Sequence, residues 1–297
     1  TLSLHDALPI LNIFKNSGMS SFDVVRIVRK VACEKKVGHT GTLDPEAIGV
    51  LPVCLGKATK IIDYIMNDKK SYKVKFKLGV TTTTYDLEGE ILSESDTSNI
   101  TVEETLEAIN KFKGTYNQVP PMYSALKKNG VRLYELARKG IEVEREGRPI
   151  TIYDIKDIEI NLPYISMEVT CSKGTYIRSL CYDIGEALKV GACMTDLRRT
   201  ETSCFHERDS INIKDLTSEN IHNYIISIED ALKFYPKLKV NEGFSKLLIN
   251  GVRVMDRRLT NEKIDNNILY RVYDENDKFL GLGKRELNGF KIEKLLI

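Results

Sequence analysis

The chain has 297 residues, 42% of them apolar and 29% charged, and its formal net charge is only +2. This balance excludes a disordered chain, and the lack of an apolar run of about 18 residues excludes a transmembrane helix. The length predicts one large and one small domain in a globular protein, and the weak overall charge does not by itself indicate a polyanionic partner.

Neither the cysteines nor the first residues indicate secretion. The six cysteines form no CxxC pair and lie mostly in apolar patterns, which favours reduced core thiols over disulfides or a zinc site. Residues 1–10 have no basic region followed by a long apolar stretch, so we predict no signal peptide. We therefore expect a cytoplasmic protein.

Regular elements are predicted from the N-terminal third onward. Residues 10–14 have the composition of a short strand, and a helix should begin at Ser20, because Ser20 and Asp23 have the spacing of a capping box. Apolar residues at helical spacing predict a second helix over residues 56–65. Residues 71–78 alternate between apolar and polar side chains, which predicts a strand with one buried and one cationic face.

Helices and strands continue to alternate through the middle of the chain. A helix with a capping box is predicted to begin at Thr101 and to stop at Gly114. Alternating residues predict strands at 150–160 and 167–171, and helical spacing returns over residues 177–188.

The pattern of the last part of the chain predicts a separate unit. Tyr235 and Pro236 mark a boundary, after which a short helix is expected at residues 244–249. Strands are predicted at residues 268–273 and 278–282. The C-terminal unit is therefore expected to be small and rich in β structure.

Residues 118–147 interrupt the regular pattern with prolines, glycines, many bases and two tyrosines. We interpret this segment as a long, partly helical excursion from the core, and excursions of this length are often functional. Basic side chains interleaved with Tyr123 and Tyr134 suit contact with nucleic acid, although a solvated hairpin is the alternative.

Residues 36–60 contain the most informative carboxylate of the chain. Asp44 lies between a loop rich in glycine and threonine and a proline, where backbone can approach a bulky partner closely. The alternative is a helix N-cap, because an aspartate followed by Pro45 is also a common helix start. The spacing excludes a Walker A loop and a GxSxG elbow, and the four histidines are too scattered to form a metal site. The residues alone therefore favour the helix cap.

Two residues far away in the sequence are candidates to join Asp44. Arg178 lies in the first turn of its predicted helix, where a cation opposes the helix dipole and an anionic partner would explain it. Tyr72 lies on the apolar face of its predicted strand, where the alternative is an ordinary core aromatic.

At these residues the chain resembles the TruB family, the tRNA pseudouridine-55 synthases, over nearly its whole length. The block KVGHTGTLDPEAIGVLPVCLGKATK, residues 36–60, is the most specific match. The shorter matches follow in the order that the family has: Lys15 with Gly18, Tyr72, residues 123–127, residues 173–178 and residues 197–199.

The resemblance implies an α+β fold with a mixed, largely antiparallel central sheet flanked by helices. This catalytic domain would occupy residues 1–235, and a small β-rich, PUA-like RNA-binding domain would occupy residues 236–297. The implied activity is that of an isomerase that converts the T-loop uridine at tRNA position 55 to pseudouridine. The resemblance implies a tRNA T-stem-loop as partner, no cofactor, no metal, no membrane and no obligate protein partner.

The resemblance also implies roles for the three candidate residues. Asp44 would be the catalytic aspartate, attacking the base or assisting at the sugar carbon, and the residues do not choose between these. Arg178 would pair with Asp44 and keep it ionised. Tyr72 would stack on the target base and could remove its C5 proton. We expect Arg178 and Tyr72 to converge on Asp44 in an open basic cleft.

The target uridine must leave its stack to reach such a site. His39 would contact the region of the flipped base, Gly38 and Gly41 would allow close approach, and bases in the excursion would hold phosphates. The implied substrate and RNA contacts are His39, Gly38, Gly41, Thr42, Lys15, Tyr123, Lys127, Arg132, Lys173, Tyr176 and Leu197.

The chain departs from the family pattern at three places. Asn16 stands where the family usually has proline, and Thr83 stands where it has an aspartate, which places local support of the site in question. Residues 1–9 match nothing in the family and are interpreted as a non-native leader.

Two other function classes remain as alternatives. A non-catalytic RNA-binding or RNA-folding protein would need only the basic clusters and the PUA-like domain. A nucleoside or glycoside hydrolase would usually need a pair of catalytic carboxylates.

Overall fold

The computed structural model describes residues 9–66, 68–255 and 263–297. The predicted leader therefore lies outside the described residues except for Pro9, whose carbonyl accepts the Leu55 N–H. Within the described residues, no helix is long and apolar enough to cross a bilayer. All six cysteines are free, as predicted, although Cys33 is exposed rather than in the core.

A single large sheet organises the first three quarters of the chain. Most of its pairs are antiparallel, whereas β1 with β14 and β3 with β12 are parallel, so the predicted mixed and largely antiparallel sheet is confirmed. Three short strands pair outside the main order: β13 (Phe205–His206), β15 (Ile225–Ile226) and β2 (Val37–His39). The main order is β14 (Ile211–Asn212), β1 (Ile10–Lys15), β3 (Ile48–Leu55), β12 (Ala192–Thr202), β4 (Lys70–Leu78), β11 (Tyr164–Cys171), β10 (Arg148–Asn161) and β7 (Gly114–Gln118).

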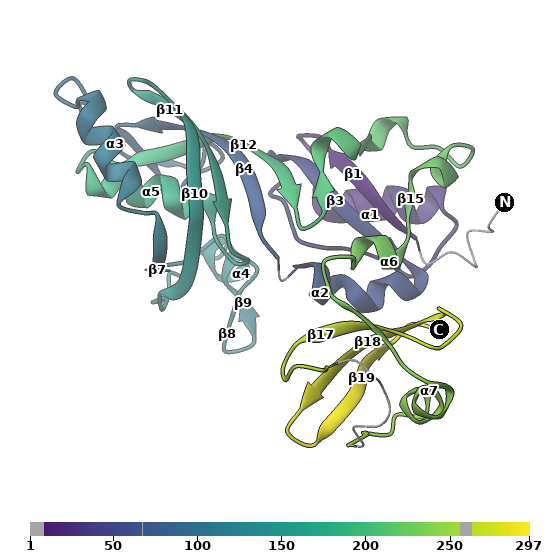
Figure 1. The fold of residues 1–297 in the computed structure, drawn as a ribbon. Coiled ribbons are helices and arrows are strands. Elements are labelled where there is room, and N and C mark those ends of the chain that lie inside the picture. The colour runs from purple at the N-terminus through teal and green to yellow at the C-terminus, as the bar shows by residue number, and fades with distance from the viewer. Residues whose placement is uncertain (1–8, 67, 256–262) are drawn as a thin grey trace.

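The helices cover this sheet in two groups. Figure 1 shows α1 (Ser21–Val31) beside β1 and β3, and α3 (Val102–Asn110) and α5 (Ile177–Ala187) beside β10 and β11. The capping boxes predicted at Ser20 and Thr101 are both present. The helix at Thr101 ends at Asn110, and the predicted stop at Gly114 is instead the first residue of β7.

The predicted strand at residues 71–78 is confirmed as β4. Tyr72, Val74 and Phe76 are buried, whereas Lys73 and Lys75 on the other face are exposed. The apolar face packs in the main core, to which α5 contributes Leu180 and Ile184. The alternation therefore separates a core face from a face that is free to line a cleft.

Other elements differ from their predictions in length or kind. The predicted helix at residues 56–65 begins as a 3₁₀ helix, η1 (Gly56–Ile61), and continues as α2 (Ile62–Met66). The excursion at residues 118–147 contains a two-stranded ribbon, β8 (Lys127–Lys128) with β9 (Val131–Arg132), and the short helix α4 (Leu133–Ala137). The remaining short elements are β5 (Val80–Thr82), β6 (Ile91–Glu94), η2 (Glu207–Asp209), η3 (Ile213–Asp215), η4 (Ile221–Tyr224) and α6 (Ile228–Ala231).

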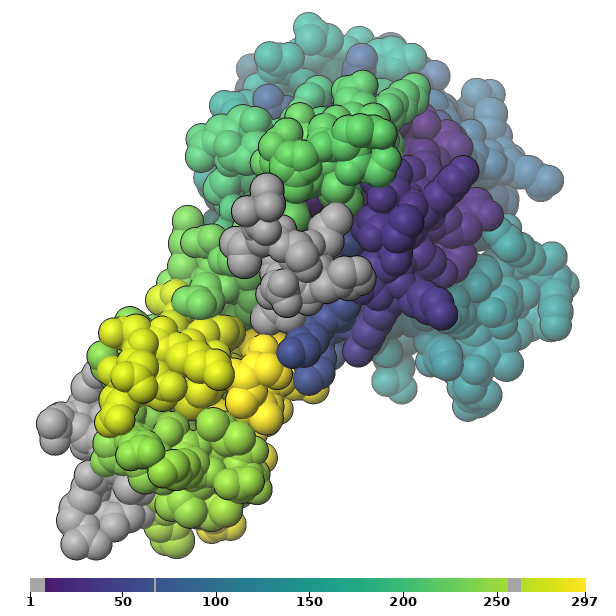
Figure 2. All heavy atoms as spheres, turned by 90° about the vertical axis from the view of Figure 1, so that its right-hand side faces the viewer, coloured from purple at the N-terminus to yellow at the C-terminus, as the bar shows by residue number. Residues whose placement is uncertain are grey.

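The C-terminal part forms its own four-stranded sheet, so the predicted β-rich unit is confirmed. Its strands lie in the order β16 (Lys237–Lys239), β17 (Leu269–Tyr273), β18 (Phe279–Glu286) and β19 (Gly289–Leu295), with α7 (Glu242–Ile249) packed beside them. Leu282 and Leu296 share a buried cluster with Ile61 and Ile65, which joins this sheet to the body. Figure 2 shows the C-terminal unit as a lobe that projects from the body.

The junction of the two halves of the large sheet depends on Gly49. β3 and β12 pair only at Ile48 with Arg198 and at Gly49 with Arg199. Gly49 has a φ of +109°, and a Cβ added to it would overlap the Arg199 carbonyl oxygen. The close approach of these strands therefore requires glycine.

We predict that Gly49→Ala lowers the free energy of unfolding by more than about 2 kcal/mol, because it adds a steric overlap to an unfavourable φ. Denaturant unfolding monitored by circular dichroism measures the loss. Gly114→Ala is the matched control, since Gly114 has a φ of +104° and open space around its Cβ position. It should cost only about 1–2 kcal/mol, the contribution of φ alone. Equal losses in the two variants would contradict this explanation.

Candidate active site

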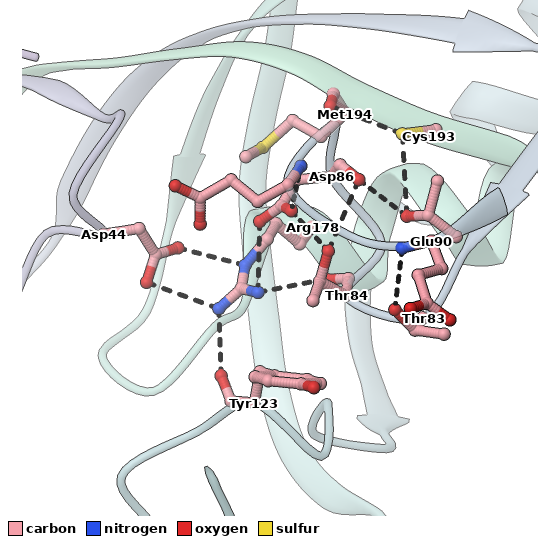
Figure 3. Close-up of polar contacts among 11 residues, drawn as sticks. Asp44, Thr83, Thr84, Asp86, Glu90, Tyr123, Arg178, Cys193 and Met194 are labelled. Carbon is pink, nitrogen blue, oxygen red and sulfur yellow. Dashed lines mark hydrogen bonds and ion pairs between the residues drawn. The ribbon is translucent and has the colours of Figure 1, made fainter. Parts of the chain in front are cut away.

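The guanidinium of Arg178 is the centre of a buried polar network. Arg178 is the second residue of α5, and its side chain is only 7% exposed. Each of its three nitrogens takes part in a hydrogen bond or an ion pair (Figure 3). The acceptors are both carboxylate oxygens of Asp44 at 3.0 and 3.3 Å, Oδ2 of Asp86 at 3.2 Å, and the carbonyls of Thr84 and Tyr123, each at 3.0 Å.

Asp44 lies in the loop between β2 and β3. No helix follows it, because β3 begins at Ile48, so the helix-cap alternative is wrong. Its side chain is 37% exposed and lines a cleft of about 820 Å³. Burial raises the pKa of Asp44, and the neighbouring Asp86 carboxylate raises it further. The Arg178 guanidinium acts in the opposite direction and lowers this pKa. Arg178 thus fixes the orientation of the Asp44 carboxylate, which faces the open cleft.

Asp86 is the site residue that the sequence reasoning missed. It follows β5 in a turn where Thr84 donates its hydroxyl hydrogen bond to the Asp86 carboxylate, and the Glu88 N–H donates to the same oxygen. Asp86 also lines the cleft and forms the second ion pair of Arg178. In the sequence, Asp86 is a lone aspartate in a threonine-rich turn. Such residues are typical of turns in general, so the pattern did not identify Asp86 as a site residue.

Buried cations hold the backbone of the Asp44 loop. Arg199 is 1% exposed and donates to the Gly41 carbonyl at 3.0 Å and to the Val50 carbonyl at 2.7 Å. Ser21 of α1 both donates to and accepts from the backbone of Leu43. These contacts tie the loop at both ends, so the position of Asp44 is set by the fold.

Lys15 is buried, so the prediction that it contacts RNA is wrong. Lys15 is fully buried, and its ammonium donates to the carbonyls of Asn16, Met19 and Pro45 at 2.7–2.9 Å. Burial lowers its pKa to about 8. With three carbonyl acceptors, Lys15 joins the end of β1 to the residue that follows Asp44.

Tyr72 lies on the core face of β4 and pairs with Arg199 of β12. It is 7% exposed, and burial raises the pKa of its phenol while the Arg199 guanidinium opposes that rise. The Asp44 carboxylate is close enough to add to the increase in pKa. Arg178 therefore contacts Asp44 directly, as expected, whereas Tyr72 lies in the core and is not among the residues that line the cleft.

The cleft beside Asp44 is not basic, and that expectation is wrong. Its bases are Lys73, Lys75 and Arg198. They are outnumbered by carboxylates, namely those of Asp44, Glu46, Asp86, Glu88, Asp157, Glu159, Glu168 and Asp196.

The other four predicted RNA contacts that precede Asp44 differ in their surroundings. His39 accepts the Gly41 N–H through Nδ1 at 3.2 Å, and burial lowers the pKa of its imidazole. A Cβ on Gly38 would lie 2.9 Å from Ile62, so internal packing explains this glycine without RNA. Gly41 has a φ of +136°, which also explains it locally, and Thr42 is exposed.

The remaining predicted contacts spread over three elements. Lys127 and Arg132 are exposed on the β8–β9 ribbon, and Lys173 is exposed just before α5. Tyr123 and Tyr176 are half-buried beside Arg178 and at the start of α5. Leu197 lies on β12 and lines the cleft.

The two departures from the family pattern are locally accommodated. Thr83 bonds through its backbone and hydroxyl to Glu90, away from Arg178, while Thr84 supports Asp86 (Figure 3). Asn16 exchanges side-chain amide hydrogen bonds with Asn212 on β14. Neither substitution removes a contact of the Asp44–Arg178 pair.

Among the residues that the structure describes, no group of three or more histidine, cysteine or acidic side chains is placed to hold a metal ion.

Comparisons with known proteins agree with this architecture. The family model described as the TruB family pseudouridylate synthase N-terminal domain matches residues 29–177, and that of the tRNA pseudouridylate synthase B C-terminal domain matches residues 178–233. Both matches end before residues 236–297, the predicted PUA-like domain.

Relatives of nearly full length are also found. A tRNA pseudouridine synthase B of Clostridium perfringens is 65% identical over 289 residues, which are 97% of this chain and 98% of the relative. One of Clostridium tetani is 57% identical over 288 residues, with 97% and 99% coverage. Among solved structures, a Cbf5–Nop10–Gar1 complex contains a chain with a TM-score of 0.77 and 25% identity, covering 100% of this chain and 86% of that one.

The fold and these matches define the class of the protein as a pseudouridylate synthase, which is an isomerase. The chain belongs to the TruB family.

We predict that Lys15→Met lowers the free energy of unfolding by about 2–4 kcal/mol, because it leaves buried carbonyls without donors. Urea unfolding measures the change. Lys127→Met removes the same charge from an exposed position and should leave stability within about 0.5 kcal/mol of the parent. A stability of Lys15→Met equal to that of this control would contradict the structural role of Lys15.

Proposed function

We propose that this enzyme converts the T-loop uridine at position 55 of tRNA to pseudouridine, with Asp44 as its catalytic carboxylate. One observation carries the proposal: both oxygens of Asp44 are held by the buried Arg178 at the edge of a cleft that can admit a nucleobase. Its relatives, which are named tRNA pseudouridine synthase B, support tRNA as the substrate.

The reaction is an isomerisation in which every atom is retained. The C1′–N1 bond breaks, the uracil turns within the cleft, and a C1′–C5 bond forms. The C5 proton then leaves, and N1 gains a proton. Asp44 serves by attacking the base or by assisting at C1′, and both routes require the ionised carboxylate. The Arg178 guanidinium favours that ionised form and fixes its direction.

Burial makes Asp44 more basic than an exposed aspartate, and this suits a nucleophile or proton acceptor near neutral pH. Tyr72 stays a predicted contact of the base. It is buried, and its raised pKa keeps the phenol protonated at neutral pH, so it would have to lose that proton before it could accept the one from C5.

RNA binding is assigned to surfaces outside the cleft. The exposed Lys127 and Arg132 on the excursion would hold phosphates of the T-stem-loop, and His39 and Thr42 would lie beside the flipped nucleotide. The projecting lobe of residues 236–297 would serve as the PUA-like contact to the same RNA (Figure 2). A cytoplasmic location and action without a protein partner stay predictions.

We predict that Asp44→Asn lowers tritium release from C5-labelled uridine in a T-stem-loop RNA by more than about a hundredfold, because the amide is neither a nucleophile nor a base. Filter binding should give an unchanged Kd for the RNA. Asp154→Asn is the control, since Asp154 is an exposed residue of β10 whose ion pair is with Lys113. Tritium release that survives in Asp44→Asn would overturn the role of Asp44, and free uracil among the products would indicate a hydrolase instead.

We predict that activity is lost on acidification at a pH above the ordinary aspartate pKa of about 3.9, because burial raises the pKa of Asp44 and only the ionised form reacts. Arg178→Met removes the opposing cation, which raises this pKa further, so the acid limb should move to higher pH. Single-turnover rates over the acid range measure the limb, and circular dichroism confirms that each variant stays folded. A limb that moves to lower pH would contradict the assignment.

A further inference from the structure

We propose that Gln118, at the base of the excursion, is a positioning residue that sets the orientation of Arg178, and through it that of Asp44. The inference rests on the proposed function, because it assigns to the known site a support that links it to the RNA-contacting excursion.

Gln118 holds the first backbone unit of α5. It is the last residue of β7 and is only 3% exposed. Its amide nitrogen donates to the Tyr176 carbonyl at 3.1 Å, and its amide oxygen accepts the Tyr176 N–H at 2.9 Å. Tyr176 is the N-cap residue of α5 and has no side-chain cap of its own. A single side chain therefore fixes both backbone groups of the residue where the helix begins.

This attachment lies two residues before Arg178. Arg178 lies in the first turn of α5, so a rotation of that turn would move its Cα and, with it, the guanidinium. Arg178 makes five hydrogen bonds and ion pairs in all, and a small displacement would lengthen several of them together. The orientation of Arg178 thus depends on the position of the α5 N-terminus.

The residues that follow Gln118 make further contacts with the same turn. The Val119 carbonyl accepts from the hydroxyl of Ser179, and the Tyr123 carbonyl accepts from Arg178 itself. The first part of the excursion is therefore bonded to three of the four residues at the start of α5, namely residues 176, 178 and 179.

The second arm of the excursion, which leads back to β10, reaches the turn at Thr84–Asp86 that also holds Arg178. Arg145 donates to the Pro120 carbonyl at 3.3 Å, which joins the two arms, and it also interacts with the Tyr85 hydroxyl. Tyr85 stands between Thr84 and Asp86, which both bind Arg178. Both arms of the excursion thus contact elements that hold the guanidinium.

The outer part of the excursion is exposed, whereas its base is anchored. Lys127, Lys128 and Arg132 on the ribbon are exposed, and Gln118 is buried. RNA that binds the ribbon would therefore act on a segment whose base is bonded to α5. The geometry links phosphate contacts at the tip to the alignment of the carboxylate in the cleft.

The test compares Gln118→Ala with Thr115→Ala. Thr115 lies on the same strand, and its hydroxyl is hydrogen-bonded to that of Thr151 on β10, away from α5. Gln118→Ala should lower the single-turnover rate of tritium release about tenfold or more, because misplaced catalytic groups lose rate steeply. The Kd for the T-stem-loop should change less than about twofold, and Thr115→Ala should behave like the parent in both measurements.

A second readout separates positioning from loss of stability. If Gln118 acts through Arg178, Gln118→Ala should move the acid limb of activity to higher pH. A displaced guanidinium would oppose less well the rise in the pKa of Asp44 that burial causes. In an Arg178→Lys background, Gln118→Ala should then cause almost no further loss of rate. Ile152→Val, a core change on β10, is expected to lower Tm without moving the acid limb.

If Gln118→Ala does not fold, Gln118→Met replaces it, because it keeps about the same volume and adds no charge but loses both bonds to Tyr176. A parental rate and acid limb in the Gln118 variant, or a loss that adds fully to that of Arg178→Lys, would overturn the inference. Activity that survives in Asp44→Asn would instead overturn the proposed function, so the two failures are distinguishable.

Discussion

The buried ion pairs of Arg178 are the constraint on which the site depends. A guanidinium removed from water is unfavourable unless its charge and all its donors are compensated, and removing one partner of such a pair is strongly destabilising. Here the compensation comes from the Asp44 loop, the turn at Thr84–Asp86, and the excursion at Tyr123. Segments that lie far apart in the chain must therefore be correctly placed before the arginine is satisfied. Folding and assembly of the site are in this sense the same event.

The Asp44 loop has no regular structure, and buried cations bind its backbone carbonyls instead. Lys15 and Arg199 are both buried, and their donors bind backbone carbonyls rather than carboxylates. Such bonds compensate carbonyls that would be paired within a helix or a sheet. Gly49 allows β12 to approach closely enough for Arg199 to reach the loop. The precise placement of Asp44 thus results from three residues that need not contact substrate.

Elements with local signals could be predicted from the sequence, whereas residues defined by tertiary contacts could not. The capping boxes at Ser20 and Thr101 and the alternation in β4 depend on neighbouring residues, and each was found. Lys15 was predicted to contact RNA from the family resemblance, and only the fold shows that three carbonyls surround it. Asp86 and Gln118 were missed because their partners, Arg178 and Tyr176, are far away in sequence. The helix-cap alternative for Asp44 had a sound local basis, and it failed because β3 follows.

The acidic lining of the cleft has a consequence for the kind of molecule that can enter. Carboxylates such as Asp157, Glu159 and Asp196 surround the space into which Asp44 faces. They repel a phosphate, whereas an uncharged uracil meets no such barrier. A free uridine monophosphate would have to carry its charge inward, but a nucleotide within a polymer can leave its phosphates on the rim while its base turns in. The cleft therefore discriminates by charge between a polymer and its own monomer, before any base is read.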